Sequence, residues 1–75
     1  MNKNRRKQLI ELQKQIEALK DQLESILWDE QSYYDSIPEN LQYSSRAEES
    51  EEAINNMEDA IDNISDAMNA IEDVL

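Results

Sequence analysis

Acidic residues recur at a fixed interval in the second half of the chain. Residues 53–73 read as three seven-residue blocks, AINNMED, AIDNISD and AMNAIED, and each block closes with an aspartate, Asp59, Asp66 or Asp73. Glu52 precedes them by the same interval, so the four carboxylates fall on one line of a helix, because seven residues make about two turns. Such a line can attract a basic protein surface, or it can serve only to keep the protein solvated.

Other chemistry-bearing residue types are scarce. The chain has no histidine, no cysteine and no glycine, so it lacks an ordinary nucleophile and base pair, a thiolate metal site and a glycine-rich phosphate loop. Glu58, Asp59, Asp62 and Asp66 are close on a helix, but a straight helix cannot wrap Ca²⁺ with about six to eight oxygens. We therefore expect no catalytic residue, no cofactor and no metal, and a protein that is not an enzyme.

All four aromatic residues fall within sixteen positions: Trp28, Tyr33, Tyr34 and Tyr43. They can form a local core that closes one end of a helical bundle, or they can form a recognition surface, where Trp and Tyr are enriched. Tyr33 continues the apolar line of the first helix and Tyr34 does not. We therefore expect Tyr34 to be a surface anchor for a partner, with Trp28 and Tyr43 beside it.

Two long helices must position these side chains. Apolar residues alternate spacings of three and four in both halves of the chain, which is typical of helices packed at a heptad-like period. The expected seam of the first helix, broken once at Glu30, is Leu9, Leu12, Ile16, Leu19, Leu23, Ile26, Tyr33 and Ile37. The expected seam of the second is Ile54, Met57, Ile61, Ile64, Met68, Ile71 and Leu75.

The single proline separates the two helices, because Pro38 disfavours a helical conformation at Ile37. The sequence therefore predicts an all-α, antiparallel two-helix hairpin over residues 1–75, with helix one about 4–35, a turn about 36–44 and helix two about 45–75. Ser45 and Glu48 have the spacing of a capping box at the start of helix two.

Antiparallel pairing brings the two ends of the chain together. It is expected to lay Arg5, Arg6 and Lys7 beside Glu72 and Asp73. A hairpin of 75 residues is below the size at which one core comfortably supports a monomer. We therefore expect a homodimer that forms a four-helix bundle.

Small residues recur beside the second seam. Ala53, Ala60 and Ala67 lie beside the seam of helix two, where they either let another helix approach closely or simply favour helix formation.

The charge is unevenly distributed. Seven basic and eighteen acidic residues give a net charge of −11, and six of the basic residues lie within residues 1–20. Such a chain is repelled by nucleic acid and by anionic lipid, so the expected partner is a basic protein surface rather than nucleic acid or a membrane. No stretch of about 18 apolar residues could span a membrane, so we expect a cytoplasmic protein.

The acidic helix could imitate a nucleic-acid backbone. Residues 47–75 carry ten carboxylates and no cation, an average of one charge per about 4 Å of helix. Duplex DNA carries one per about 1.7 Å. The negative charges of a single chain are therefore too widely spaced to imitate DNA. The imitation requires a dimer whose two acidic helices share a face.

The connecting segment carries a resemblance. Ile37-Pro38-Glu39-Asn40-Leu41, followed by Ser45-Arg46, is similar to a segment of small acidic helical-hairpin proteins of phages and mobile elements of Gram-positive bacteria. The resemblance covers nearly the whole chain. It implies a hairpin in the cytoplasm of a host cell and carries no activity with it.

A second resemblance concerns Ser45, Arg46 and Ser50. Phage-encoded helical hairpins that sequester cyclic-nucleotide immune signals have a similar Ser-Arg element after a proline turn. The resemblance implies that Arg46 contacts a phosphate.

Three functions remain open. In the leading hypothesis, the acidic face and the aromatic turn bind a basic surface of a host defence or replication protein, such as its nucleic-acid-binding site. The acidic residues expected to contact this partner are Glu52, Asp59, Asp62, Asp66 and Asp73. In the second, the chain is a structural or assembly subunit. In the third, it is a sponge for a cyclic nucleotide.

Overall fold

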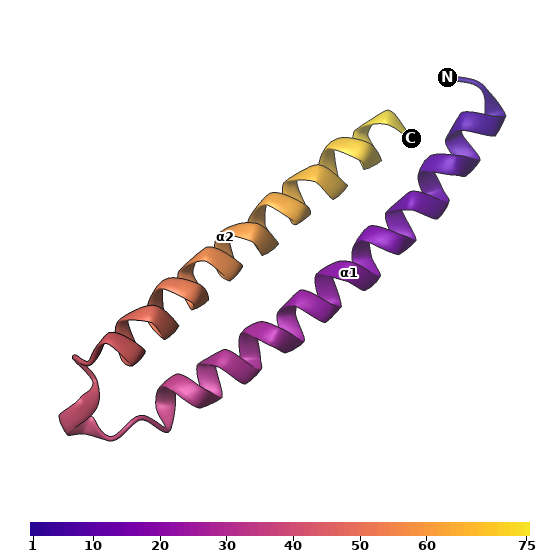
Figure 1. The fold of residues 1–75 in the computed structure, drawn as a ribbon. Coiled ribbons are helices and arrows are strands. Elements are labelled where there is room, and N and C mark those ends of the chain that lie inside the picture. The colour runs from indigo at the N-terminus through magenta and orange to yellow at the C-terminus, as the bar shows by residue number, and fades with distance from the viewer.

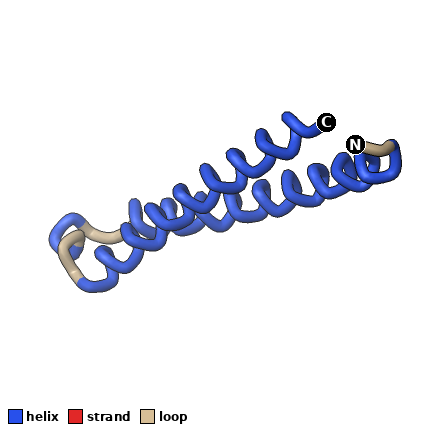
Figure 2. Tube along the Cα trace, turned by 90° about the horizontal axis from the view of Figure 1, so that it is seen from above, coloured by secondary structure: helices blue, strands red, loops and turns tan.

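The protein is a rod made of two antiparallel helices. The computed structural model describes residues 1–75, with α1 at Lys3–Asp35, a 3₁₀ helix at Glu39–Leu41 and α2 at Ser45–Val74. The helices lie side by side, and both termini lie at the end opposite the connection (Figure 1). Figure 2 shows that the main loops lie in the connection between α1 and α2 and that the chain has no strand. The predicted all-α helical hairpin is confirmed.

The shape is elongated. The principal extents are 59 × 15 × 12 Å and the radius of gyration is 17.3 Å, whereas a compact chain of this length has a radius of about 11 Å. Neither helix contains an apolar stretch long enough to cross a bilayer.

Local hydrogen bonds fix the ends of both helices. The side chain of Asn2 accepts from the backbone N–H of Arg5 at 2.8 Å, and the side chain of Ser44 accepts from the backbone N–H of Ala47 at 3.3 Å. These bonds satisfy amides that have no partner within the first helical turn.

The predicted capping box of Ser45 and Glu48 is wrong. Ser44 has the extended backbone of a cap, at φ −72° and ψ 161°, whereas Ser45 is already helical. The third helical position is therefore Ala47, which cannot complete a capping box.

The seam of α2 follows the predicted line. Its large residues are half-buried against α1, except for the exposed Leu75. Only Leu27, Ala47 and Ser50 in the whole chain are fully buried. The seam is thus a narrow strip rather than an enclosed core.

The predicted seam of α1 is half wrong. Leu9, Ile16, Leu23 and Glu30 face α2 as expected, but the residues halfway between them on the predicted line are exposed. Four other residues take their place as half-buried or buried contacts with α2, namely Gln13, Lys20, Leu27 and Tyr34. The exposed residues, which we call the exposed stripe, are Leu12, Leu19, Ile26 and Tyr33.

Polar residues of α1 reach α2 through specific bonds. The amide Nε2 of Gln13 donates to the carbonyl oxygen of Met68 at 3.0 Å, and the hydroxyl of Ser50 donates to Oε2 of Glu30 at 2.9 Å. Glu30, which breaks the apolar pattern in the sequence, is therefore accommodated by a serine on the facing helix. These two bonds set the register of α1 against α2.

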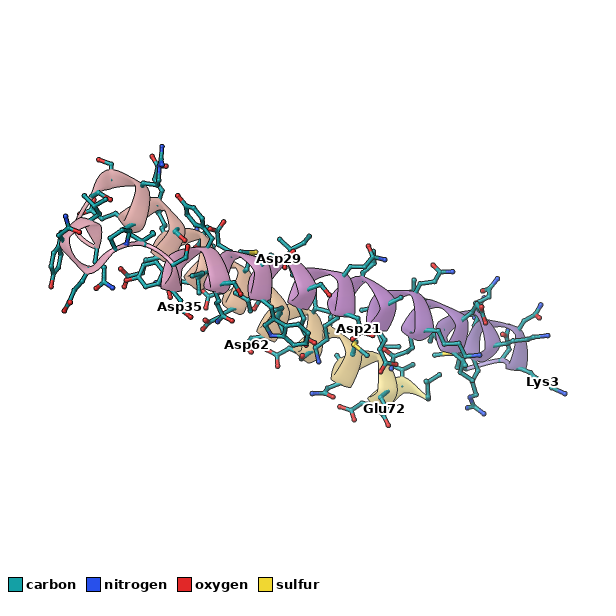
Figure 3. All side chains as sticks on the ribbon, turned by 90° about the horizontal axis from the view of Figure 1, so that it is seen from below. Lys3, Asp21, Asp29, Asp35, Asp62 and Glu72 are labelled. Carbon is teal, nitrogen blue, oxygen red and sulfur yellow. The ribbon has the colours of Figure 1, made fainter.

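The expected pairing of charges at the chain ends is not formed. The two ion pairs, Lys14–Glu11 and Lys20–Glu24, both lie within α1, each with N···O of 3.9 Å. Arg5, Arg6 and Lys7 are exposed. In Figure 3, Lys3 lies beyond the end of α2, away from Glu72. Solvated, flexible side chains at the open end gain little from pairing.

The cap assignment yields a prediction. Ser44→Ala should lower the free energy of unfolding by about 1 kcal/mol, because it removes the cap acceptor. Ser45→Ala should change it by less than about 0.5 kcal/mol, because an exposed serine at the first helical position is replaced by a better helix former. Urea unfolding followed by circular dichroism at one chain concentration measures both. A larger loss in Ser45→Ala than in Ser44→Ala would contradict the assignment.

Candidate functional site

Two recesses adjoin on one side of the seam. The first has a volume of ≈ 300 Å³ and is lined by Gln31, Tyr34, Asp35, Glu51 and Ile54. The second has a volume of ≈ 330 Å³ and is lined by Glu24, Leu27, Trp28, Glu58, Ile61 and Asp62. They follow one another along the same side of the seam. We call their acidic and aromatic residues together the acidic groove: Glu24, Trp28, Tyr34, Asp35, Glu51, Glu58 and Asp62.

Helical periodicity explains why these side chains meet. Trp28 and Asp35 are seven residues apart on α1, and Glu51 and Glu58 are seven apart on α2. Residues at this spacing project from the same side of a helix. Figure 3 shows Asp35, Asp62 and Glu72 along one edge of the hairpin.

The groove combines carboxylates with an exposed aromatic face. Trp28 is 60% exposed, and the same recess holds the carboxylates of Glu24, Glu58 and Asp62. Only Glu24 is paired, with Lys20 on its own helix. A lysine or arginine entering this recess could lie over the indole ring and pair with a carboxylate at the same time.

The first recess, around Tyr34, repeats this composition. Tyr34 is half-buried there, beside Asp35 and Glu51. Because α1 rises about 1.5 Å per residue, Trp28 and Asp35 are about 10 Å apart along it. The two recesses that combine carboxylates with an aromatic ring are therefore about 10 Å apart.

The sequence prediction placed only part of this site. Trp28, Tyr34 and Asp62 are brought together, as a partner surface requires. The prediction that Tyr33 is on the seam and Tyr34 is off it is wrong, since Tyr33 is 41% exposed and Tyr34 is half-buried. Tyr34 therefore contributes an edge of the groove rather than a free anchor.

The remaining predicted partner residues lie elsewhere. Glu52, Asp59, Asp66 and Asp73 are exposed and line neither recess. Tyr43 is 92% exposed in the connection, and it too lines neither recess. The acidic line of α2 and the acidic groove are thus separate surfaces.

Sequence reasoning missed Glu24, Asp35, Glu51 and Glu58. The available signal was their position directly beside the apolar seam, where a charge borders a groove instead of pointing straight into solvent. No three carboxylates of the chain converge on a point that could hold a metal ion.

The other side of the seam has a different recess near the connection. It has a volume of ≈ 320 Å³ and is lined by Glu30, Tyr33, Arg46, Glu49 and Ser50. Arg46 therefore shares its recess with two carboxylates, and the hydroxyl of Ser50 is directed to one of them. This composition suits a cation better than the phosphate that the second resemblance implies.

Comparison with known proteins finds no matching family model, no matching curated protein and no matching solved structure. The function is therefore argued from the residues of this chain.

The bond between Ser50 and Glu30 yields a prediction. Ser50→Ala should lower the free energy of unfolding by about 1–2 kcal/mol, because it leaves a half-buried carboxylate without its donor. In a double-mutant cycle with Glu30→Ala, the coupling should be about 0.5–1.5 kcal/mol. Thermal and urea unfolding of the four chains measure it.

Ser65→Ala is the matched control, since Ser65 is a half-buried serine of α2 with no side-chain hydrogen bond. Equal losses in the two serine variants, or a coupling near zero, would contradict a stabilising role for the bond.

Proposed function

We propose that the protein is a non-enzymatic binding module whose acidic groove holds a basic segment of a partner protein. The observation that supports this proposal most directly is the single recess that combines the exposed Trp28 with Glu24, Glu58 and Asp62. An indole face beside carboxylates is a chemical match for arginine or lysine.

The energetics require several contacts at once. An exposed ion pair contributes about 0–1 kcal/mol, and an exposed cation–π contact contributes about 0.5–1 kcal/mol. One basic side chain is therefore held weakly. A segment that fills both recesses gains from each of them without a second loss of translational freedom.

The spacing of the recesses suggests which segment fits. A segment in the extended polyproline II conformation rises about 3.1 Å per residue with three residues per turn, so side chains three residues apart lie on the same side and about 9 Å apart. We propose that the groove prefers an extended segment with arginine or lysine at every third position.

The partner class follows from charge. Proteins that bind nucleic acid expose basic surfaces for the phosphates, and these are the surfaces that an acidic groove fits. We propose that this partner is a defence or replication protein in the cytoplasm of a host cell, as would suit a hairpin that resembles those of phages and mobile elements. The aromatic residues add recognition that the sparse carboxylates of one chain would not supply alone.

The first test is calorimetric titration with a nonapeptide that carries arginine at every third position. Glu58→Gln combined with Asp62→Asn should weaken binding about tenfold, which corresponds to about 1.4 kcal/mol. Asp59→Asn combined with Asp66→Asn is the matched control, because it removes the same charge from outside the groove. The control should weaken binding less than threefold. Equal weakening would show that only net charge matters and would contradict a groove.

The second test concerns the aromatic residues. Trp28→Leu should weaken binding of the same peptide about two- to fivefold, because it removes a cation–π contact of about 0.5–1 kcal/mol. Tyr43→Leu, a change to an exposed aromatic residue outside the groove, should leave affinity within twofold. Loss of peptide affinity in Tyr43→Leu but not in Trp28→Leu would place the site at the connection instead.

The proposed partner class can be tested by competition. Duplex DNA should displace a DNA-binding partner from the protein more effectively at low salt than at high salt.

A further inference from the structure

The exposed stripe runs along the side of the hairpin opposite the acidic groove. Leu12, Leu19, Ile26 and Tyr33 are 43%, 59%, 57% and 41% exposed. They are seven residues apart, so they form one line along α1. A regular apolar line of this length on a charged chain marks a surface that packs against another protein.

Small residues of α2 lie on the same side. Tyr33 shares a recess with Arg46 and Glu49, and steps of seven from Arg46 reach Ala53, Ala60 and Ala67. The bonds from Gln13 to Met68 and from Ser50 to Glu30 fix the register. At this register the large residues of the stripe lie level with the alanines: Leu12 with Ala67, Leu19 with Ala60, and Ile26 with Ala53.

This side is free of charge over most of its length. The residues that border it are amides, from Gln15 and Gln22 on α1 to Asn56 and Asn63 on α2. Charged residues return at its two ends. Arg5 precedes Leu12 by seven residues at the open end, and Ile26 and Tyr33 share a recess with Asp29 and Glu30 near the connection. We call the exposed stripe, the three alanines and these four amides the neutral face.

The neutral face limits what can cover it. Over most of the length of this face, a basic partner would find no carboxylate to pair with. A second copy of this chain carries a net charge of −11, and it is repelled everywhere except where carboxylates are missing. The face therefore fits a second copy better than it fits the partner of the acidic groove.

The solvent-exposed surface area of the chain also favours a second copy. The chain exposes 5882 Å², whereas a compact monomer of its mass exposes about 4,800 Å². The excess of about 1,100 Å² is comparable to the roughly 800 Å² per partner that a stable interface buries.

We propose that two copies pack through their neutral faces into a four-helix bundle with both connections at the same end. In this arrangement α1 of each copy lies against α2 of the other. The leucines and isoleucine of one exposed stripe then meet the alanines of the other copy, so large side chains fill the space beside small ones.

Charge selects this arrangement over the alternative with connections at opposite ends. The alternative sets α2 against α2, and each α2 carries ten carboxylates. The proposed arrangement instead separates the two acidic helices to opposite corners. It also places Arg5, Arg6 and Lys7 of one copy near Glu72 and Asp73 of the other.

The arrangement determines where the acidic grooves lie. Each groove is on the side of its hairpin opposite the neutral face, so the dimer presents two grooves on opposite sides of the bundle. This inference does not depend on what the grooves bind.

The first experiment measures molar mass. The chain should sediment at twice its mass of 8.8 kDa at micromolar concentration. Leu19→Gln combined with Ile26→Gln should weaken dimerisation at least a hundredfold. Trp28→Gln is the matched control, because it removes an equally exposed apolar side chain from the opposite side, and its dimer should be unchanged. A wild-type chain of single mass, or an unchanged dimer in the double variant, would overturn the proposal.

The second experiment is independent of destabilising changes. The chain has no cysteine, so Tyr43→Cys accepts one spin label at the connection. Electron–electron distance measurement should place the two labels within about 30 Å, because neighbouring helix axes lie about 8–10 Å apart. Labels separated by nearly the 59 Å length of the rod would overturn the arrangement.

Discussion

The structure depends on one geometric limit: a single neighbouring helix can bury only part of the surface of another helix. The apolar band of α1 includes Ile26 and Leu27, and adjacent residues of a helix point about 100° apart. A single partner helix covers one side of such a band and leaves the other exposed. Here α2 covers the line of Leu27 and leaves the line of Ile26 in solvent. The buried strip, the exposed stripe and the separation of two differently charged sides all follow from this limit.

The exposed stripe also explains why the sequence predicted the fold better than the packing. The period of three and four, the single proline and the missing glycines were enough to predict two helices and their antiparallel pairing. The same period does not determine whether a given line of apolar residues on α1 packs against α2 or stays exposed. Glu30 interrupts the apolar pattern in the sequence. In the structure, its carboxylate accepts a hydrogen bond from the hydroxyl of Ser50 on the facing helix. Such a pairing between distant positions cannot be read from either helix alone.

The candidate site was predictable only in its chemistry. The absence of histidine and cysteine and the excess of carboxylates favoured a basic partner. The regular aspartates that closed each repeat drew attention to the outward line of α2, whereas the recesses lie beside the seam. There Trp28 and Tyr34 meet Glu51, Glu58 and Asp62. The proposed recognition of a basic segment uses aromatic rings beside carboxylates, and the outward line of aspartates has no aromatic ring. In the proposed dimer, a second copy covers the neutral face on the opposite side, and the acidic groove stays open.

The central claim is that a second copy covers the neutral face with α1 against α2. The most direct measurement is an isotope-filtered nuclear Overhauser experiment on an equimolar mixture of labelled and unlabelled chains. It detects only contacts between copies. The account predicts contacts between the methyl groups of Leu19 in one copy and Ala60 in the other. Contacts of Ala60 with Ala60, or no contact between copies at all, would contradict it.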